Sequence, residues 1–242
     1  MPKKLQNELQ HLHGSNMTKF LLAQEHIDHF RKHGVIEFDG IFTEEELLHF
    51  LASLENILHK SLLPTEHHPL GQFSNECLYQ SGRNLWKKGA AVKKLLSKKQ
   101  IGHLAAELFA VKSVRLAFDQ YLKTGDNQDL PFKESYTLQQ ISSVRPILGA
   151  LVLQLKPPHS NIELPFIPKN IGSAVFVAGN LALDLPSLFQ EKDLSIFVVA
   201  FTTAKALYCL EPLDPHTHAY KKDGIIFGDA AGEDLCPTIY HR

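Results

Sequence analysis

The sequence predicts an α+β protein in which an N-terminal helical layer packs on an antiparallel β core. Apolar residues recur at three- and four-residue spacing up to about residue 110, and short runs rich in branched and aromatic residues follow. The intervals between these runs are too short for a helix between each pair, which disfavours a parallel sheet. We expect a weakly ordered extension over 1–17, a mainly helical layer with one strand over 18–110, and a β core with a C-terminal tail over 111–242, all in one compact domain.

The helical layer is expected to open with a helix, a strand and a second helix. Helix-type spacing occurs in FLLAQEHIDHFRKHG, TEEELLHFLASLENILHKSLL and AAVKKLLSKKQIGHLAAELF. Between the first two, GVIEFDGIF has the alternation of a strand. Gly34 can end the first helix, and Thr43 with Glu46 three residues later forms a capping box that starts the second.

The predicted β core consists of short runs separated by clusters of Pro, Gly, Asn and Asp. The runs are SVRLAFDQYL, SYTLQQISSV, ILGALVLQL, SAVFVAGNLAL, LSIFVVAFTT and ALYCL. This pattern is typical of an antiparallel sandwich or barrel.

Composition and charge exclude several classes of function. The chain has 242 residues, 44% of them hydrophobic, and a formal net charge of -1, which gives no overall attraction to nucleic acid or anionic membrane. The N-terminal stretch has no apolar run of signal-peptide length, and the longest apolar runs, such as ILGALVLQL, are about half a membrane span, so we expect a cytoplasmic protein without membrane contact. Three distant cysteines, Cys77, Cys209 and Cys236, suit reduced thiols better than disulfides or a zinc cluster.

Two stretches carry a family resemblance. HIDHFRKHGVIEFDGIFTEEELLHFL combines a helix, a strand and a second helix begun by an acidic capping motif, and GSAVFVAGNLALDL places a Gly and a small residue before an apolar strand. Together they resemble the phytanoyl-CoA dioxygenase-like branch of the Fe(II)/2-oxoglutarate-dependent oxygenases, over residues 24–205. The resemblance implies a double-stranded β-helix, which is a cupin-like jelly-roll barrel. For an active member it also implies Fe(II), 2-oxoglutarate and hydroxylation.

The iron ligands that this resemblance implies are missing from their expected positions. Such a site needs two histidines and one carboxylate on one face of the metal. The His-x-Asp pair of the early barrel strand falls on Gln139 and Ile141, and the distal histidine falls on Leu183 or Asp184. Lys192 is the loose counterpart of the basic residue that pairs with the keto acid. We therefore expect no metal, and a non-catalytic small-molecule-binding or regulatory role.

An active oxygenase or other metalloenzyme with an atypical site is the alternative. Its backup metal ligands are Asp184, Asp214, His216 and His218. The last three alternate along LDPHTHAY, which would place them on one face of a strand. Pro215 instead favours a turn that starts a short helix, and on a helix His216 and His218 would diverge by about 200°.

A literal His-x-Asp occurs at His26 and Asp28, on the first predicted helix. The two side chains diverge by about 200° on that helix, so they cannot chelate one ion. We interpret them as polar residues of the helix surface.

Two further side chains are candidates for a ligand pocket. Asp119 lies in a predicted strand, either as a binding or acid-base group at the barrel mouth or as a strand cap or partner of Arg115. Arg145 is either a carboxylate or phosphate ligand or a rim residue before Pro146. The ligand-pocket candidates are thus Asp119, Gln139, Arg145, Asp184 and Lys192.

The segment SGRNLWKKGAAVKKLLSKKQIGH carries seven positive charges without an intervening acidic residue. They are Arg83, Lys87, Lys88, Lys93, Lys94, Lys98 and Lys99. The row is either a solvated helix face or a surface for a phosphate-bearing ligand or an anionic partner. The latter interpretation gives a third hypothesis, an adaptor whose basic helix docks the partner while the barrel serves as scaffold.

Overall fold

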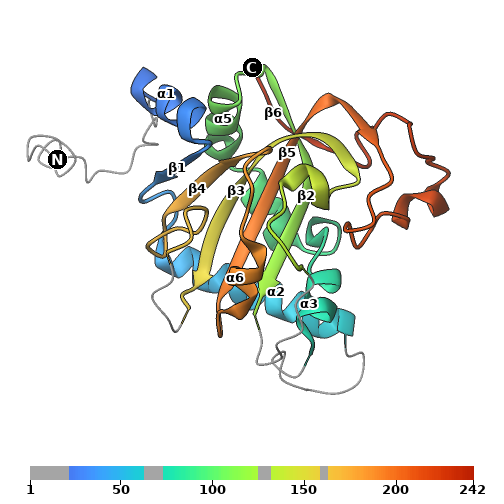
Figure 1. Ribbon diagram of the computed structural model, residues 1–242, viewed down its shortest axis with the longest axis horizontal. Coiled ribbons are helices and arrows are strands. Elements are labelled where there is room, and N and C mark those ends of the chain that lie inside the picture. The colour runs from blue at the N-terminus through green and yellow to red at the C-terminus, as the bar shows by residue number, and fades with distance from the viewer. Residues whose placement is uncertain (1–21, 63–72, 125–131, 159–162) are drawn as a thin grey trace, which may run out of the picture.

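A computed structural model describes residues 22–62, 73–124, 132–158 and 163–242, which form a curled antiparallel sheet with helices packed on it (Figure 1). The extension expected over 1–17 lies outside these residues. The sheet has six strands in the order β1-β4-β3-β5-β2-β6, and every pairing is antiparallel. The strands are β1 (Val35–Phe38), β2 (Ser113–Lys123), β3 (Val144–Lys156), β4 (Ala174–Ala178), β5 (Ser195–Tyr208) and β6 (Thr238–His241). The predicted α+β class is confirmed.

Most helices precede the second strand. They are α1 (Gln24–His33), α2 (Glu44–Leu62), α3 (Asn75–Ser81), α4 (Ala90–Leu96), α5 (Lys99–Leu108) and, later in the chain, α6 (Leu185–Gln190). The described residues also include the short 3-10 helices η2 (Leu85–Lys87), η3 (Leu138–Ile141) and η4 (Ala219–Asp223). Among the described residues, no helix combines the length and the apolar character needed to cross a bilayer.

The predicted opening of helix, strand and helix is confirmed. Gly34 ends α1 in the left-handed region, with φ 71°, which costs glycine little because it has no Cβ. The Thr43 hydroxyl accepts a hydrogen bond from the Glu46 amide, and the Glu46 carboxylate accepts one from the Thr43 amide. This capping box starts α2 at the predicted point.

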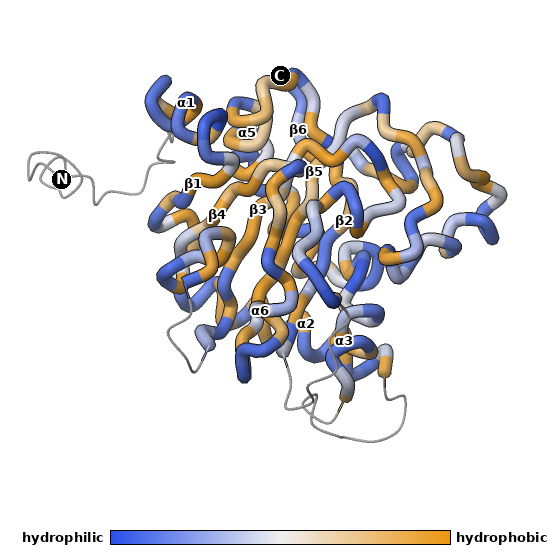
Figure 2. The backbone as a smooth tube through the Cα atoms, in the orientation of Figure 1, coloured by the Kyte–Doolittle hydropathy of each residue, from blue (hydrophilic) through white to orange (hydrophobic). Residues whose placement is uncertain are grey.

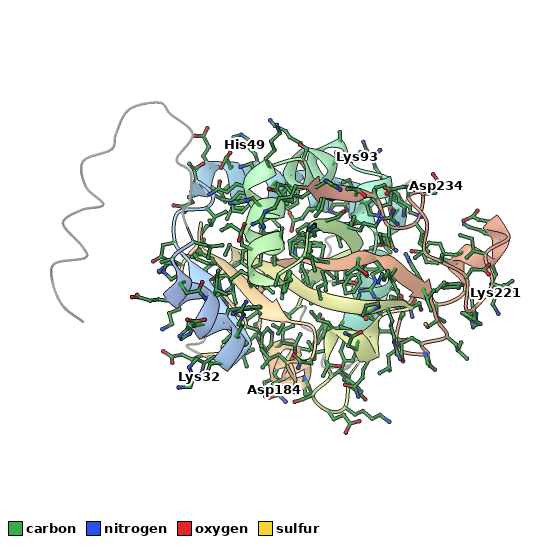
Figure 3. All side chains as sticks on the ribbon, turned by 90° about the horizontal axis from the view of Figure 1, so that it is seen from above. Lys32, His49, Lys93, Asp184, Lys221 and Asp234 are labelled. Carbon is green, nitrogen blue, oxygen red and sulfur yellow. The ribbon has the colours of Figure 1, made fainter. Side chains whose placement is uncertain are left out.

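The sheet is buried on both faces. Successive side chains of a strand point to opposite sides, so each central strand contributes to two cores. Along β5, Phe197 and Val199 belong to the core beneath the helical layer, whereas Val198 and Ala200 belong to the core on the other face. The central strands are accordingly apolar along most of their length (Figure 2). Figure 3 shows His49 of α2 and Lys93 of α4 on one side of the sheet and Asp184, before α6, on the other.

Two strand predictions are wrong. LSIFVVAFTT and ALYCL form one strand, β5, because no Gly or Pro separates them. SYTLQQISSV is not a strand at all. Thr137 and Gln140 form a capping box around η3, with the Thr137 amide donating to the Gln140 side chain over 2.9 Å, and β3 starts only at Val144. Local hydrogen bonds of polar side chains thus override the β-type composition of this stretch.

A double-stranded β-helix is expected to have two facing sheets, and the second of them is reduced here to a short contact. Tyr136 and Leu183 form an isolated antiparallel bridge on the face of the sheet that carries α6. Their backbone N–H groups donate to each other's carbonyls over 3.1 and 2.9 Å. The described residues therefore form one six-stranded sheet and three isolated bridges, of which this is one, in place of two full sheets.

Residues 82–84 cover the open edge of β2. β6 pairs only with residues 113–115, and farther along β2 the Asn84 amide donates to Asp119 O while the Tyr121 amide donates to Gly82 O, both over 2.9 Å. At Gly82 an added Cβ would lie 2.2 Å from the carbonyl oxygen of Tyr121. Glycine at this position is what allows the chain to approach β2 so closely.

We expect Gly82→Ala to lower the free energy of unfolding by about 1–3 kcal/mol, because the methyl group must displace backbone. Urea denaturation measures the change. Gly232→Ala is the matched control, since an added Cβ there meets nothing within 4 Å. Its effect should stay within about 0.5 kcal/mol. Equal stability of Gly82→Ala and the wild type would contradict the close approach.

Candidate functional site

A small apolar cavity lies between the sheet and the segments that cover its α6 side. Its volume is about 30 Å³, which leaves room for roughly one water molecule. Val152, Val177 and Val198 contribute to its wall from β3, β4 and β5. Three polar residues also line it, namely Tyr79, Arg83 and Gln120.

Two positions at which the resemblance implies iron ligands lie on the wall of this cavity. They are Ile141 and Leu183, both buried, and the bridge between Tyr136 and Leu183 joins the two covering segments. Hydrocarbon side chains cannot coordinate a metal. The Gln139 amide instead accepts a hydrogen bond from Ile147 N and donates one to Ile147 O. Gln139, a predicted pocket residue, does not line this cavity.

Arg83 forms the charged end of the cavity. Its side chain is only 1% exposed, and its guanidinium carbon lies 3.4 Å from the centre of the Phe118 ring. Nη2 donates to Ile141 O over 2.7 Å and lies 3.3 Å from Asp214 Oδ2, while Nη1 lies 3.5 Å from Gln120 Oε1. The prediction that Arg83 belongs to a surface row of cations is therefore wrong, because its charge is neutralised inside the protein.

Asp214 is a structural carboxylate that binds Arg83 and two backbone amides. Its Oδ2 accepts from Ser143 N over 2.7 Å, and its Oδ1 accepts from His216 N over 2.9 Å. Burial by itself raises the pKa of Asp214, but the charge of Arg83 and the two amide donors outweigh burial and hold the pKa below its ordinary value. The carboxylate is thus kept ionised at neutral pH.

The backup metal ligands do not converge. His216 Nδ1 lies 3.2 Å from Asn84 Nδ2, and the His218 ring packs 5.9 Å from that of Phe227. Within the described part of the chain, no three His, Cys, Asp or Glu side chains are arranged to hold a metal. The prediction of a turn that starts a short helix is confirmed, since residues 215–218 form turns that lead into η4.

The polar network continues from the ion pair to Asn84. This residue adopts the left-handed conformation, with φ 57° and ψ 42°, and its Nδ2 donates to the Tyr220 hydroxyl over 3.0 Å. Burial and the nearby charge of Arg83 lower the pKa of His216, and burial raises the pKa of Tyr220. Both side chains are therefore neutral at pH 7, so Arg83 and Asp214 carry the charge of the network.

Comparison with known proteins places this geometry in a fold. No protein-family model and no curated protein matches the sequence. The structure resembles the non-heme alpha-ketoglutarate-dependent carbocyclase SnoK from nogalamycin biosynthesis, with a TM-score of 0.63 and 15% identity over 90% of this chain and 96% of SnoK. The epimerase SnoN from the same biosynthesis has a TM-score of 0.60 and 13% identity, over 89% of this chain and 97% of SnoN. CytC3, solved with Fe(II) and alpha-ketoglutarate, has a TM-score of 0.53 and 12% identity, over 78% of this chain and 80% of CytC3. The chain has the fold of non-heme, alpha-ketoglutarate-dependent enzymes.

Within this oxygenase fold, Asp119 faces away from the cavity. Its two oxygens accept from Leu85 N over 2.9 Å and from Trp86 N over 3.1 Å, so it caps η2. Burial raises the pKa of Asp119 to about 7, although the two amide bonds act in the opposite direction. The predicted pairing with Arg115 is not found, because Arg115 binds Glu233 over 2.6 Å. Asp119 does act as a cap, but of η2 and not of its own strand.

The remaining ligand-pocket candidates lie apart from the cavity and from one another. Arg145 forms an ion pair with Glu211 at the rim. Asp184 caps α6 by accepting from Ser187 N over 3.1 Å and from the Ser187 hydroxyl over 2.6 Å. Lys192 is exposed in the turn after α6. None of the five predicted pocket residues lines this cavity, and a ligand role for them stays a prediction.

The six lysines of the basic row lie on the surface around η2, α4 and α5. Lys98 pairs with Glu46 over 2.9 Å, Lys88 donates to Ser61 over 3.3 Å, and the Lys87 ammonium lies 4.9 Å from the centre of the Tyr220 ring. Lys93, Lys94 and Lys99 are exposed and form no ion pair within the described ranges. An anionic partner for this surface stays a prediction.

The sequence did not place Tyr79, Arg83 or Gln120, the polar residues of the cavity, in a ligand pocket. Gln120 follows Asp119 directly, and a shift of one position along a strand exchanges the two faces. Arg83 stands between Gly82, which permits the close approach to β2, and Asn84, which is a residue type that tolerates the left-handed region. Gly-Arg-Asn between two helical stretches is thus the local signal for an anchored, inward-facing arginine.

Asp214→Asn should change how stability depends on pH. The pKa of Asp214 is depressed in the folded state, so its contribution to stability is present above the unfolded pKa of about 4 and is lost as the pH falls through the folded pKa. We expect wild-type stability to fall more steeply below about pH 4 than that of Asp214→Asn, which loses about 3–5 kcal/mol at pH 7. Urea denaturation between pH 3 and 7 measures both.

Asp234→Asn is the matched control for this pH series, because Asp234 is exposed (Figure 3). It should keep the wild-type profile. Parallel profiles for Asp214→Asn and the wild type would contradict the role assigned to Asp214.

Proposed function

We propose that this chain is a phytanoyl-CoA dioxygenase-like member of the Fe(II)/2-oxoglutarate oxygenase superfamily whose β-helix does not hold iron. It acts by binding or regulation rather than by hydroxylation. The fold shared with SnoK and SnoN supports the superfamily, and the helix, strand and capped helix at the start of the domain support the branch.

The chemistry of the cavity wall is the observation that carries this proposal. Fe(II) in such enzymes needs histidine and carboxylate ligands with open positions beside them. Here Ile141 and Leu183 stand at two implied ligand positions, and the charged group at the cavity is the cation Arg83. The residues present therefore do not fit an iron centre.

The Asp214 carboxylate, the possible metal ligand next to Arg83, is already occupied by contacts within the protein. The Asp214 carboxylate binds Arg83 and two backbone amides, so coordinating a metal would leave the buried guanidinium without its counter-charge. The cavity of about 30 Å³ is moreover far smaller than the roughly 300–1,000 Å³ of small-molecule sites. A keto acid cannot enter it without displacing side chains.

Anaerobic titration with Fe(II) in the presence of 2-oxoglutarate tests the proposal. We expect no stoichiometric Fe(II) binding by calorimetry and no succinate formation above the buffer blank, because no ligand set is available. An active oxygenase of the same fold, assayed in parallel, controls for the quality of the iron and the keto acid. One equivalent of bound iron together with turnover of 2-oxoglutarate would overturn the proposal and favour the atypical metalloenzyme.

A further inference from the structure

A second, larger hollow lies on the opposite side of the sheet, between α2 and α4. Its volume is about 330 Å³, within the range of small-molecule sites. Figure 3 shows this side of the molecule, where His49 of α2 and Lys93 of α4 are labelled. We call it the α2–α4 groove, and define it by its lining residues Phe42, Glu46, Leu47, His49, Phe50, Ser53, Ala91, Lys94, Leu95 and Lys98.

The floor of the α2–α4 groove is apolar and belongs to the core. Phe42, Leu47, Phe50 and Leu95 are 1–7% exposed and pack within the cluster beneath the helical layer. Phe50 is held edge-on against Phe197 of the sheet, with ring centres 4.9 Å apart. Because the floor is anchored in this way, the hollow is a preformed feature of the fold.

Helical spacing explains both the opening and its polar rim. Glu46, His49, Phe50 and Ser53 recur at positions i, i+3, i+4 and i+7 along α2, so they share one face. On α4, Ala91, Lys94 and Leu95 share one face in the same way, with the small side chain of Ala91 leaving space. Lys93 precedes Lys94 on the same helix but does not line the groove.

Most polar groups of the rim already have partners. Glu46 accepts from Thr43 N through Oε2 and binds Lys98 through Oε1, over 3.1 and 2.9 Å. His49 Nδ1 lies 3.0 Å from Glu45 O, and the Ser53 hydroxyl donates to His49 O over 2.9 Å. The Lys98 ammonium also lies 4.5 Å from the centre of the Phe42 ring. In the described structure this leaves the Lys94 ammonium as the main donor for a ligand, with the remaining N–H groups of Lys98 beside it.

The charge of the rim is positive. Among the residues that line the groove, Lys94 and Lys98 face a single carboxylate, that of Glu46. The hydrogen bond from Lys98 lowers the pKa of Glu46 most, burial opposes it, and Lys94 adds to the lowering. An anionic head group is therefore attracted to this rim, whereas a cation is repelled.

We propose that the α2–α4 groove binds a small amphipathic carboxylate. The hydrocarbon body lies on Phe50 and Leu95, and the head group accepts hydrogen bonds from Lys94 and Lys98. This site is distinct from the cavity on the α6 side of the sheet and needs no metal. It therefore goes beyond the proposed function and is tested separately from it.

Calorimetric titration of the full chain with octanoate tests the site, with octanamide as the neutral probe of the same length. We expect one octanoate per chain and about fivefold weaker binding of octanamide, because one partly exposed charge contact is lost. Lys94→Gln should weaken octanoate about fivefold and leave octanamide unchanged. Ala91→Phe, which fills the groove, should abolish binding of both probes.

Lys93→Gln is the matched control, since it removes the same charge from the same helix outside the groove. It should bind octanoate like the wild type. Three results would overturn the proposal: no octanoate binding, equal affinity of Lys94→Gln and the wild type, or an equal loss in Lys93→Gln. Octanoate binding is measured without iron, so its outcome does not depend on the Fe(II) titration.

Discussion

The buried ion pair between Arg83 and Asp214 is the interaction on which the covered face of the sheet depends. Removing two charges from water costs several kcal/mol each, and a buried pair persists only with good geometry and further hydrogen bonds. Here the guanidinium nitrogens Nη1 and Nη2 and both carboxylate oxygens have partners, whereas the buried Arg83 Nε has none among the described residues. The guanidinium stacks on Phe118 and donates to Ile141 O, and the carboxylate accepts from two backbone amides.

The pair joins three segments that lie far apart in the chain. Arg83 follows α3, Asp214 lies in the C-terminal turn, and the Ile141 carbonyl and Ser143 amide come just before β3. Asp119 supports the arrangement from the other face of β2, because it caps η2 directly after Arg83. In an oxygenase of this fold a metal would join segments inside the barrel. In the proposed account, this chain uses an internal salt bridge and apolar packing for that purpose.

The parts of the fold that rest on local chemistry could be predicted from the sequence. Gly34 ends α1, Thr43 and Glu46 begin α2, and the turn at Pro215 forms as its residues indicate. The stretch SYTLQQISSV failed because the capping box of Thr137 and Gln140 competes with strand formation, which composition alone does not weigh.

The site could not be predicted in the same way, because its residues depend on partners distant in the sequence. Arg83 looks like one more cation in a basic row until the Asp214 carboxylate is placed beside it. Asp119 and Gln120 exchange roles through a difference of one position on β2. The order of residues in the chain does not show that Arg83 is buried or that Gln120, and not Asp119, lines the cavity. Both become clear once residues 82–84 are known to cover the edge of β2, because side chains alternate between the two faces of that strand.

A double-mutant cycle on Arg83 and Asp214 tests this account most directly, with the free energy of unfolding measured by urea denaturation at pH 7. Arg83→Met and Asp214→Leu should each cost about 3–5 kcal/mol, because each leaves one buried charge unpaired. The double variant should cost no more than either single one, which gives a coupling energy of about 3 kcal/mol or more. Additive costs in the double variant would show that the two charges do not depend on each other and would contradict the account.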